Sequence, residues 1–366
     1  MVHGGDIYTD GKLKGKQLFD FSSNVNPLPV SLKFLNNLHN ASELLPLYPD
    51  IKYRELRKDL QTYISNSNRY FSDHTKEETE YIPKAESILV GNGASEILDL
   101  TIRSLHSITI VVPSFVEYED IAEKYGLKIN YAYLNEEFEY DYAEILLKIK
   151  DTDGLIIGNP NNPNGNIIDH CRFLDIMDYC EKNNKTIIVD EAFIEFVLDN
   201  NQSLIKYAGQ YKCLVIIRAI TKFYSMAGIR FGYGITENDK VLSTVEKYQN
   251  PWSVNCFAEL AVKYALSDER FIEASVNWLL SERQWMSEHL EKVSYINKVY
   301  PSNGNYFLCS LKGVTSTELC NKLKKRNILI RNCNNYKGLD ERFVRIALKD
   351  NDKNRVILEE LNKIQV

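Results

Sequence analysis

The sequence predicts an α/β protein: a large domain with a mainly parallel sheet covered by helices on both faces, followed by a smaller α+β domain. Two observations predict this. Short β-branched runs alternate with amphipathic stretches through the middle of the chain, as in strand–helix–strand crossover units. These apolar runs mostly lack the period-two alternation of half-exposed strands, which is expected when both faces of a sheet are covered.

Six apolar runs are expected to be the strands of the large sheet. Segments with helical spacing, such as Glu96 to Leu105 and Arg172 to Lys182, are expected to connect them. The runs are "SILVGNG" at 87–93, "SITIVVPSF" at 107–115, "KINYAYL" at 128–134, "GLIIGNP" at 154–160, "KTIIVDEAF" at 185–193 and "CLVIIRA" at 213–219.

The alternation of apolar runs and amphipathic segments ends at about residue 250. Long amphipathic segments at 257–266 and 271–292 precede the short strands "YFLCSL", "NILIRN" and "RFVRIAL" and a final helix from about Asp352. This pattern favours a smaller α+β domain beside the first. We expect a large domain at 30–250 and a small C-terminal domain at 251–366, with residues 1–29 preceding them.

Composition narrows the class of protein. The 366 residues are 44% hydrophobic and 26% charged, as in globular proteins. The net charge of -6 and the lack of a dense Lys/Arg block argue against nucleic acid or an anionic membrane as partner. The chain start lacks a signal-peptide core and no apolar run is long enough to span a bilayer, so a cytoplasmic protein is expected. Seven cysteines without C-x-x-C spacing suggest buried thiols rather than disulfides or a metal site.

Polar residues stand at the ends of several predicted strands, where ligands bind in open parallel sheets. Gly93, Ala94 and Ser95 follow the first strand and open a helix, an arrangement that can cradle a phosphate, although such turns also simply reverse the chain. Asp190 ends a strongly apolar strand, where an ionised carboxylate is costly unless a cation compensates it. A functional role for this carboxylate is one interpretation, and a purely structural salt bridge is the alternative. Asn162 lies in an Asn/Pro/Gly turn and by itself reads as turn chemistry.

A lysine and an arginine complete this set. Lys222 follows the last strand of the large sheet, and Arg230 lies eight residues further on. An amine, an acidic group and a phosphate cradle in one cleft are what a pyridoxal 5'-phosphate site requires. An exposed loop lysine is the alternative for Lys222 alone, but it does not explain the ordered set.

These motifs resemble the aspartate-aminotransferase-like pyridoxal phosphate enzymes, which have the fold type I transferase architecture. The resemblance covers nearly the whole chain and rests on Gly93-Ala94-Ser95, Asn162-Pro163-x-Gly165, Asp190-x-Ala192, Lys222 and Arg230. It implies that Lys222 bonds covalently to the cofactor, that Asp190 pairs with the pyridine nitrogen, and that Asn162 donates to the phenolic oxygen. It also implies ring stacking by Phe115 and phosphate binding by Thr221, Arg230 and the Gly93 loop.

The segment "LYPDIKYRELR" at 47–57 resembles the family segment whose tyrosine reaches the neighbouring subunit's cofactor phosphate. The resemblance therefore implies a homodimer in which Tyr48 acts in trans, whereas a tyrosine packed at a helix start is the alternative. One departure from the family pattern is Ala219, where relatives commonly carry a hydroxyl group, so Thr221 is expected to supply the hydroxyl on that side.

Two branches of the family come closest: the histidinol-phosphate aminotransferases and the threonine-phosphate decarboxylases of cobalamin biosynthesis. Three features favour the decarboxylases. These are the N-terminal stretches "HGGDIY" and "FDFSSNVNPLP", Phe193 where aminotransferases usually carry tyrosine, and the form of "TKFYSMAGIRFGY". The implied substrate is a phosphorylated amino acid, threonine phosphate or serine phosphate. Histidinol-phosphate aminotransferase stays the alternative, and a regulatory protein that keeps the fold without catalysis is the alternative of another class.

Five residues are expected to hold this substrate. By resemblance Arg345 matches the family arginine that binds a substrate acid group, and Arg331 matches an arginine of the phosphate-handling relatives. Two guanidinium groups suit a substrate with two acidic groups, and surface salt bridging is the alternative. The same resemblance implies that residues 1–29 are an N-terminal arm covering the active site, and His3, Ser23 and Asn24 of this arm are expected to cover the substrate phosphate.

Overall fold

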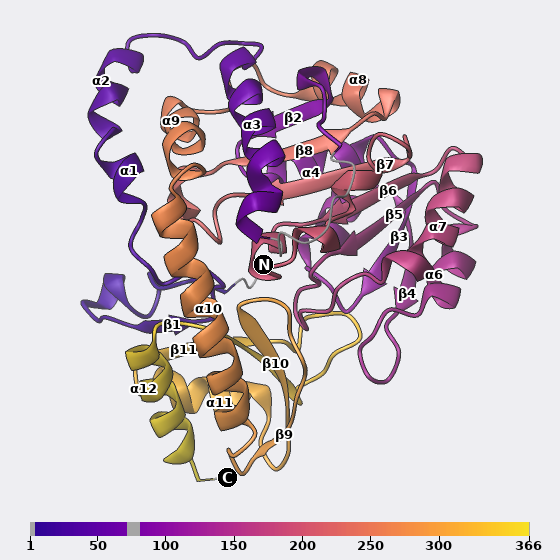
Figure 1. Cartoon of the computed structure of the whole chain (residues 1–366). Coiled ribbons are helices and arrows are strands. Elements are labelled where there is room, and N and C mark those ends of the chain that lie inside the picture. The colour runs from indigo at the N-terminus through magenta and orange to yellow at the C-terminus, as the bar shows by residue number, and fades with distance from the viewer. Residues whose placement is uncertain (1–3, 72–80, 366) are drawn as a thin grey trace.

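The computed structural model describes residues 4–71 and 81–365, which contain two sheets (Figure 1). The larger sheet has the strand order β2-β8-β7-β6-β5-β3-β4. Its neighbours β4, β3, β5, β6 and β7 pair in parallel, whereas β8 runs antiparallel to both β7 and β2. The predicted mainly parallel sheet is confirmed. Its strands are β2 (Ile88–Gly91), β3 (Ser107–Val112), β4 (Lys128–Tyr133), β5 (Gly154–Gly158), β6 (Thr186–Asp190), β7 (Leu214–Ala219) and β8 (Gly232–Thr236).

All six predicted strands of the large sheet form, and β8 is an additional strand that the apolar runs did not indicate. Glycines at 232 and 234 weaken its strand pattern. A Cβ atom at Gly232 would lie 2.2 Å from the backbone nitrogen of Ala94. The glycine is therefore needed where the chain after β2 passes close to β8.

Helices cover both faces of this sheet, as predicted (Figure 1). Alternate residues of β7 show the two cores: Ile216 packs into the cluster that includes α3, α6 and α7, and Ile217 into the cluster that includes α4, α5 and α8. Both isoleucines are fully buried. The helices are α3 (Arg54–Phe71), α4 (Ala94–Arg103), α5 (Glu117–Lys124), α6 (Tyr142–Ile149), α7 (His170–Lys182) and α8 (Asp239–Tyr248).

The smaller sheet has the strand order β1-β11-β12-β10-β9. The three predicted strands form its centre, and β1 and β9 are short edge strands that were not predicted. β1 belongs to the predicted arm and pairs in parallel with β11. The division into an arm, a large domain and a small domain stays a prediction. The strands are β1 (Phe19–Phe21), β9 (Ile296–Val299), β10 (Tyr306–Leu311), β11 (Ile328–Asn332) and β12 (Phe343–Ala347).

The remaining helices flank the two sheets (Figure 1). The long helix α10 extends from beside α9 to the smaller sheet, and α9 contacts both α1 and α3. The side chain of Asp268 caps α10 by accepting from the backbone N–H of Phe271. These helices are α1 (Leu32–Leu35), α2 (Ala41–Leu44), α9 (Cys256–Ala265), α10 (Glu269–Leu290), α11 (Ser316–Lys324) and α12 (Asn351–Asn362), and short 3-10 helices lie at Lys12–Lys14, Leu38–Asn40, Ala85–Ser87, Ile194–Phe196, Asn200–Gln202, Leu204–Tyr207 and Ala227–Ile229.

One expectation about the cysteines is wrong. Cys171 is exposed, and Cys256 and Cys320 are only partly buried, whereas the other four are buried thiols. Cys171 lies on α7, whose core-facing positions are occupied by Phe173, Ile176, Met177 and Cys180, so its side chain points to solvent.

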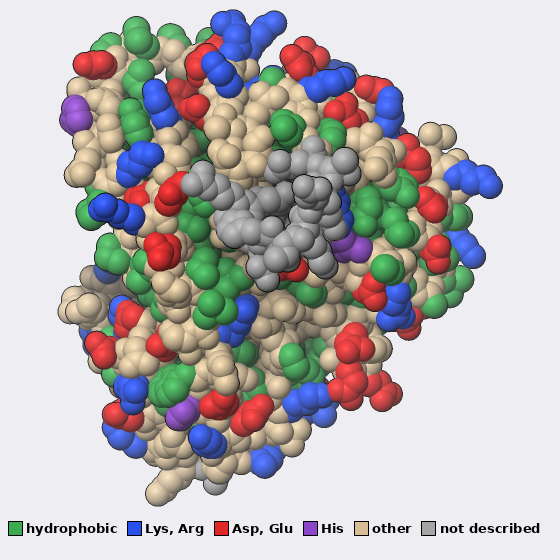
Figure 2. All heavy atoms as spheres, in the orientation of Figure 1, with side chains coloured by type: hydrophobic (Ala, Val, Ile, Leu, Met, Phe, Trp, Pro, Cys, Tyr) green, Lys and Arg blue, Asp and Glu red, His purple; other side chains and the backbone are tan. Residues whose placement is uncertain are grey.

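Figure 2 shows acidic and basic side chains interspersed over the face in view. Within the described ranges, no helix is both long and apolar enough to cross a membrane.

Candidate active site

A cavity of about 300 Å³ lies at the carboxyl ends of the parallel strands and is lined from both sheets. It brings together most of the residues singled out from the sequence. Gly93 directly precedes its wall, Tyr48 lies elsewhere on the surface, and His3 lies outside the described residues. The predicted residues that line the cavity are Ser23, Asn24, Ala94, Ser95, Phe115, Asn162, Asp190, Thr221, Lys222, Arg230, Arg331 and Arg345.

Lys222 lies three residues beyond the end of β7 and is partly buried in the cavity wall. Burial lowers the pKa of its ammonium group to about 8, and the positive charges of Arg345 and Arg230 act in the same direction. A lowered pKa increases the fraction of neutral amine near neutral pH, and the neutral amine is the form that attacks a carbonyl carbon. The backbone oxygen of Lys222 accepts a 3.0 Å hydrogen bond from the N–H of Asn26. The lysine is therefore both accessible to the cavity and fixed at its backbone.

Asp190 is the last residue of β6, and its carboxylate has two donors. Tyr118 donates its hydroxyl hydrogen at 2.5 Å to Oδ2, and the backbone N–H of Ala192 donates at 3.0 Å to Oδ1. Burial raises the pKa of Asp190, while these two hydrogen bonds oppose that shift. A carboxylate held in this way suits a partner that carries a proton on a ring nitrogen.

The loop between β2 and α4 forms a cradle with Arg230. Gly93 has φ +82°, and a Cβ atom there would lie 2.6 Å from Nη2 of Arg230. Only glycine allows both this backbone conformation and the approach of the guanidinium group. Ala94 and Ser95 at the N-terminus of α4 line one cavity together with Thr221 and Arg230. These donors fit the phosphate group of a cofactor.

Arg345 connects the two sheets across the cavity. Its Nη1 contacts Oδ1 of Asn162, and its Nη2 donates at 2.8 Å to the backbone oxygen of Ser22. Its Nε is buried and has no hydrogen-bond partner among the residues that the structure describes. A buried donor without a partner is costly, so this atom indicates a place for an acceptor from a ligand.

Arg331 stands directly opposite Arg345 on the neighbouring strand. The two residues are only 4% and 5% exposed. Arg331 donates from Nη2 at 2.8 Å to Asn335 and lies over the ring of Tyr336 at 5.0 Å. Surface salt bridging, the alternative weighed for these arginines, does not describe two buried side chains that line a cavity. The arrangement provides two guanidinium groups for acidic groups of a ligand.

The sequence reasoning did not anticipate several residues of the wall. Tyr118 and Tyr336 both line the cavity, as does the carboxylate residue Glu117. The sequence could have indicated Tyr118, because it lies only three residues after Phe115, which was predicted to contact the cofactor. In the structure the ring centroids of these two residues lie 5.7 Å apart. The hydroxyl of Tyr336 contacts Asn162 at 3.4 Å and Arg345 at 3.5 Å, and nothing in the local sequence indicated this.

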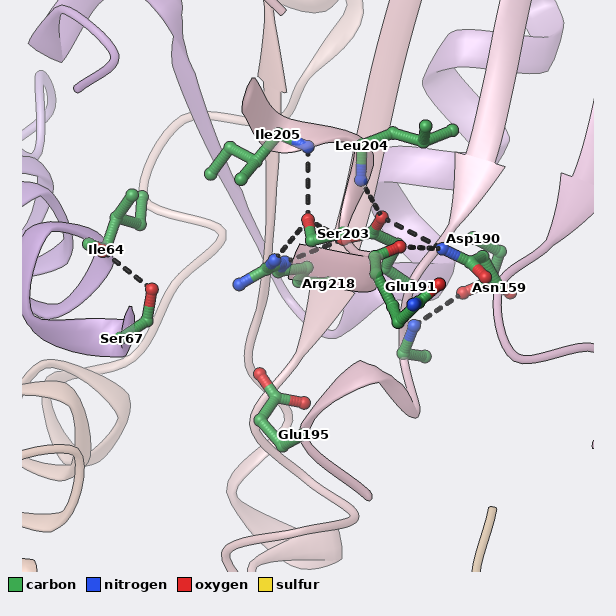
Figure 3. Close-up of polar contacts among 12 residues, drawn as sticks. Ile64, Ser67, Asn159, Asp190, Glu191, Glu195, Ser203, Leu204, Ile205 and Arg218 are labelled. Carbon is green, nitrogen blue, oxygen red and sulfur yellow. Dashed lines mark hydrogen bonds and ion pairs between the residues drawn. The ribbon is translucent and has the colours of Figure 1, made fainter. Parts of the chain in front are cut away.

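A buried ion pair stabilises the strand ends behind the cavity. Figure 3 shows the side chains of Glu191, Ser203 and Arg218 pointing toward one another. Nε of Arg218 lies 3.1 Å from Glu191 Oε2, and its Nη2 donates at 2.6 Å to Ser203. Ser203 in turn donates at 2.7 Å to Glu191. Because Glu191 directly follows Asp190, this network fixes the end of β6 against β7, whose continuation carries Lys222.

Tyr48 is 81% exposed, and its ring centroid lies 4.7 Å from that of Trp252, with the two ring planes tilted by 34°. It therefore lies on the surface of this chain and not in this chain's cavity. The role in trans that was predicted for it stays a prediction.

Comparison with known proteins gives consistent matches along the chain. The model of the family described as aminotransferase class I and II matches residues 16–361. The threonine-phosphate decarboxylase of Salmonella typhimurium is 32% identical, covering 99% of this chain and 96% of that protein. The histidinol-phosphate aminotransferase of Methanococcus aeolicus is 30% identical, covering 98% of this chain and 93% of that protein. The solved structure of the histidinol-phosphate aminotransferase from Clostridium acetobutylicum is 43% identical with a TM-score of 0.87, covering 94% of this chain and 98% of that one.

Proposed function

This chain belongs to the aminotransferase class I and II family, whose cofactor is pyridoxal 5'-phosphate, and from that premise we propose that it decarboxylates an O-phospho-amino acid. The proposed substrate is L-threonine O-3-phosphate or L-serine O-phosphate. The product is the amino-alcohol phosphate that the nucleotide loop of cobalamin uses. Similarity to the Salmonella decarboxylase over nearly the whole chain supports this proposal.

The pair Arg331 and Arg345 is the observation that carries the proposal. The two guanidinium groups lie opposite each other on neighbouring strands, and both are buried in the wall that also holds Lys222. Their hydrogen-bond partners are neutral amide, carbonyl and hydroxyl oxygens. Two buried cations with such partners favour a ligand with two acidic groups, such as a carboxylate and a phosphate.

The chemistry that pyridoxal phosphate supplies when bound is withdrawal of electrons from a breaking bond at the substrate α-carbon. Lys222 would hold the cofactor covalently, and Asp190 would keep the proton on its ring nitrogen. Asn162 would donate to its phenolic oxygen, and Phe115 would lie against its ring. The Gly93 loop, Thr221 and Arg230 would hold its phosphate.

Decarboxylation would require the substrate carboxylate to be held in one fixed orientation, so that the bound cofactor could withdraw the electrons of its bond to Cα. Arg345 would hold the carboxylate, and Arg331 with the arm residues Ser23 and Asn24 would hold the phosphate. The two anchors would fix how the substrate is oriented. The bond between Cα and the carboxylate would break with release of carbon dioxide, and the ammonium group of Lys222 would deliver the proton that replaces the carboxylate on Cα. In an aminotransferase the hydrogen on Cα would be removed instead, and the carboxylate would be kept.

We also propose a homodimer in which Tyr48 acts on the cofactor phosphate of the partner. Tyr48 and Trp252 are exposed, and Tyr48 is flanked in sequence by the exposed apolar residues Leu45, Leu47 and Ile51. Figure 2 shows hydrophobic side chains exposed at the edge that α1 and α2 form. A second copy of the chain would cover this apolar surface.

The alternative is a histidinol-phosphate aminotransferase, and the 43% identical solved structure favours it. A substrate panel separates the two activities. Purified enzyme with added pyridoxal phosphate is given phosphothreonine, phosphoserine, or histidinol phosphate together with 2-oxoglutarate. Carbon dioxide from a phospho-amino acid supports the proposal, and glutamate formed only with histidinol phosphate contradicts it. A colourless protein without any of these activities would favour the non-catalytic alternative.

A further inference from the structure

The segment 22–26 lies between the catalytic lysine and the cations of the small sheet. On one side, the N–H and the side-chain Nδ2 of Asn26 donate to the backbone oxygens of Lys222 and Phe223, at 3.0 and 2.8 Å. On the other side, Arg345 donates to the backbone oxygen of Ser22. This segment therefore joins the loop that carries Lys222 to β12.

A second cation contacts the same segment. Nζ of Lys349 donates at 2.8 Å to the backbone oxygen of Ser23 and at 3.4 Å to that of Val25. These two carbonyls flank Asn24, whose side-chain oxygen Oδ1 is buried in the cavity wall and has no partner within the described part of the chain. Oδ1 and the oxygens of a phosphate both accept hydrogen bonds, so the part of this amide that suits a phosphate is its Nδ2. Lys349 holds the backbone on both sides of that amide.

The position of Lys349 is itself fixed. Its N–H donates at 2.9 Å to Asn354 Oδ1, and its oxygen accepts from Asn354 Nδ2 at 2.7 Å and from Trp278 Nε1 at 2.9 Å. The residue is only 9% exposed, and burial lowers the pKa of its ammonium group to about 8. Burying an ammonium group is unfavourable unless hydrogen-bond acceptors replace the lost water. The carbonyl oxygens of Ser23 and Val25 are these acceptors, so the ammonium group and the backbone of residues 23–25 hold each other in place.

We propose that Lys349 is a positioning residue, which holds the backbone of residues 23–25 so that Nδ2 of Asn24 donates to the phosphate of the substrate. This inference rests on the proposed function, because it takes a phosphorylated amino acid as the ligand. Nothing in the local sequence of Lys349 indicated the role, since the bond to Ser23 joins residues 326 positions apart.

The test compares Lys349→Met with Lys353→Met in the full chain with its cofactor. Lys353 lies four residues further on, is half-exposed and pairs with Asp350, so its loss removes a nearby charge without touching the segment. The first readout is amide hydrogen exchange of residues 19–26. We expect faster exchange in Lys349→Met and wild-type exchange in Lys353→Met.

The second readout is steady-state kinetics with O-phosphothreonine. Lys349→Met is expected to raise KM about 10- to 100-fold, as for loss of charge-assisted hydrogen bonds. Because residues 23 and 24 also orient the substrate, kcat is expected to fall as well, while the cofactor absorbance stays nearly unchanged. Combining Lys349→Met with Asn24→Ala should add little to the effect of the more severe single variant. Lys349→Gln retains a neutral donor and carries the same test if Lys349→Met does not fold.

A lowered melting temperature with unchanged KM and unchanged exchange would overturn the inference and leave Lys349 a merely structural residue. Fully additive effects of Lys349→Met and Asn24→Ala on KM would also overturn it. Failure of the proposed function has a different signature. In that case the wild-type enzyme releases no carbon dioxide from O-phosphothreonine, while the exchange comparison still reports whether Lys349 holds the segment.

Discussion

The hydroxyl of Tyr118 donates a 2.5 Å hydrogen bond to the carboxylate of Asp190, so the first turn of α5 supports the residue at the end of β6. Burial raises the pKa of this carboxyl group, and the tyrosine opposes the shift. The ionised form of Asp190, which would hold a proton on the cofactor ring, therefore depends in part on Tyr118.

Replacing Tyr118 with phenylalanine should weaken this support. Loss of a hydrogen bond to a charged group predicts a fall in kcat of about 10- to 100-fold. The pKa of Asp190 rises further when the donor is lost, so the acid limb of the pH profile for cofactor binding should move to higher pH. Tyr295→Phe is a control, because Tyr295 donates at 2.7 Å to the backbone oxygen of Leu361, a buried hydroxyl away from the cavity. Equal pH profiles for Tyr118→Phe and the wild type would contradict the prediction.

Gly93→Ala should weaken cofactor binding selectively. The added methyl group would lie 2.6 Å from Arg230 and would also strain a backbone with φ +82°. We expect the dissociation constant of pyridoxal phosphate to rise about 10- to 100-fold. Gly126 is a matched control: its φ is +68°, and a Cβ atom there would meet nothing within 4 Å. Titration of cofactor-free protein with pyridoxal phosphate measures both variants, and a similar loss of affinity in Gly126→Ala would remove the cradle from the explanation.

Lys222 should attach to the cofactor with an unusual pH dependence. The neutral amine is the reactive form, and burial together with Arg345 and Arg230 lowers its pKa to about 8. The rate of covalent attachment to cofactor-free protein should therefore rise with pH through about 8. Stopped-flow absorbance measures this rate. A midpoint near the ordinary value of 10.5 would contradict the description of the site.

The variant Lys222→Ala should bind the cofactor without a covalent bond, and it should not catalyse turnover of the substrate.

Asp190→Asn should separate catalysis from stability. The neutral amide removes the unfavourable burial of a carboxylate, so the melting temperature of the cofactor-free protein should not fall. An amide does not keep the ring nitrogen protonated, so kcat should fall by about 100-fold or more. A near-normal kcat would show that another group holds that proton, and a large drop in melting temperature would show that the carboxylate is a structural residue.

Much of the fold could be predicted from the sequence, because strands buried on both faces leave continuous apolar runs. The six runs of the large sheet and the three central strands of the small sheet formed as expected. β8 contains glycines that close packing requires, and β1 and β9 are short edge strands, so the composition of these three gave little signal.

The cavity was predicted best where residues follow strands. Asp190 and Lys222 both come from the carboxyl ends of neighbouring parallel strands, and the topology brings such ends together. Tyr118, Tyr336 and Lys349 were not predicted, because their contacts depend on how a helix, a loop and a second sheet pack against those ends. The contacts join residues between 72 and 326 positions apart, and periodicity within a window carries no such information.

The most direct test of the central claim is the fate of the α-carbon of O-phosphothreonine in heavy water. The full chain with pyridoxal phosphate is incubated with this substrate, and carbon dioxide and the aminopropanol phosphate are quantified together. The account predicts equal amounts of both products and one solvent deuterium at the former α-carbon, because the proton from Lys222 replaces the carboxylate. Absence of carbon dioxide, together with transfer of the amino group from histidinol phosphate to 2-oxoglutarate, would contradict it.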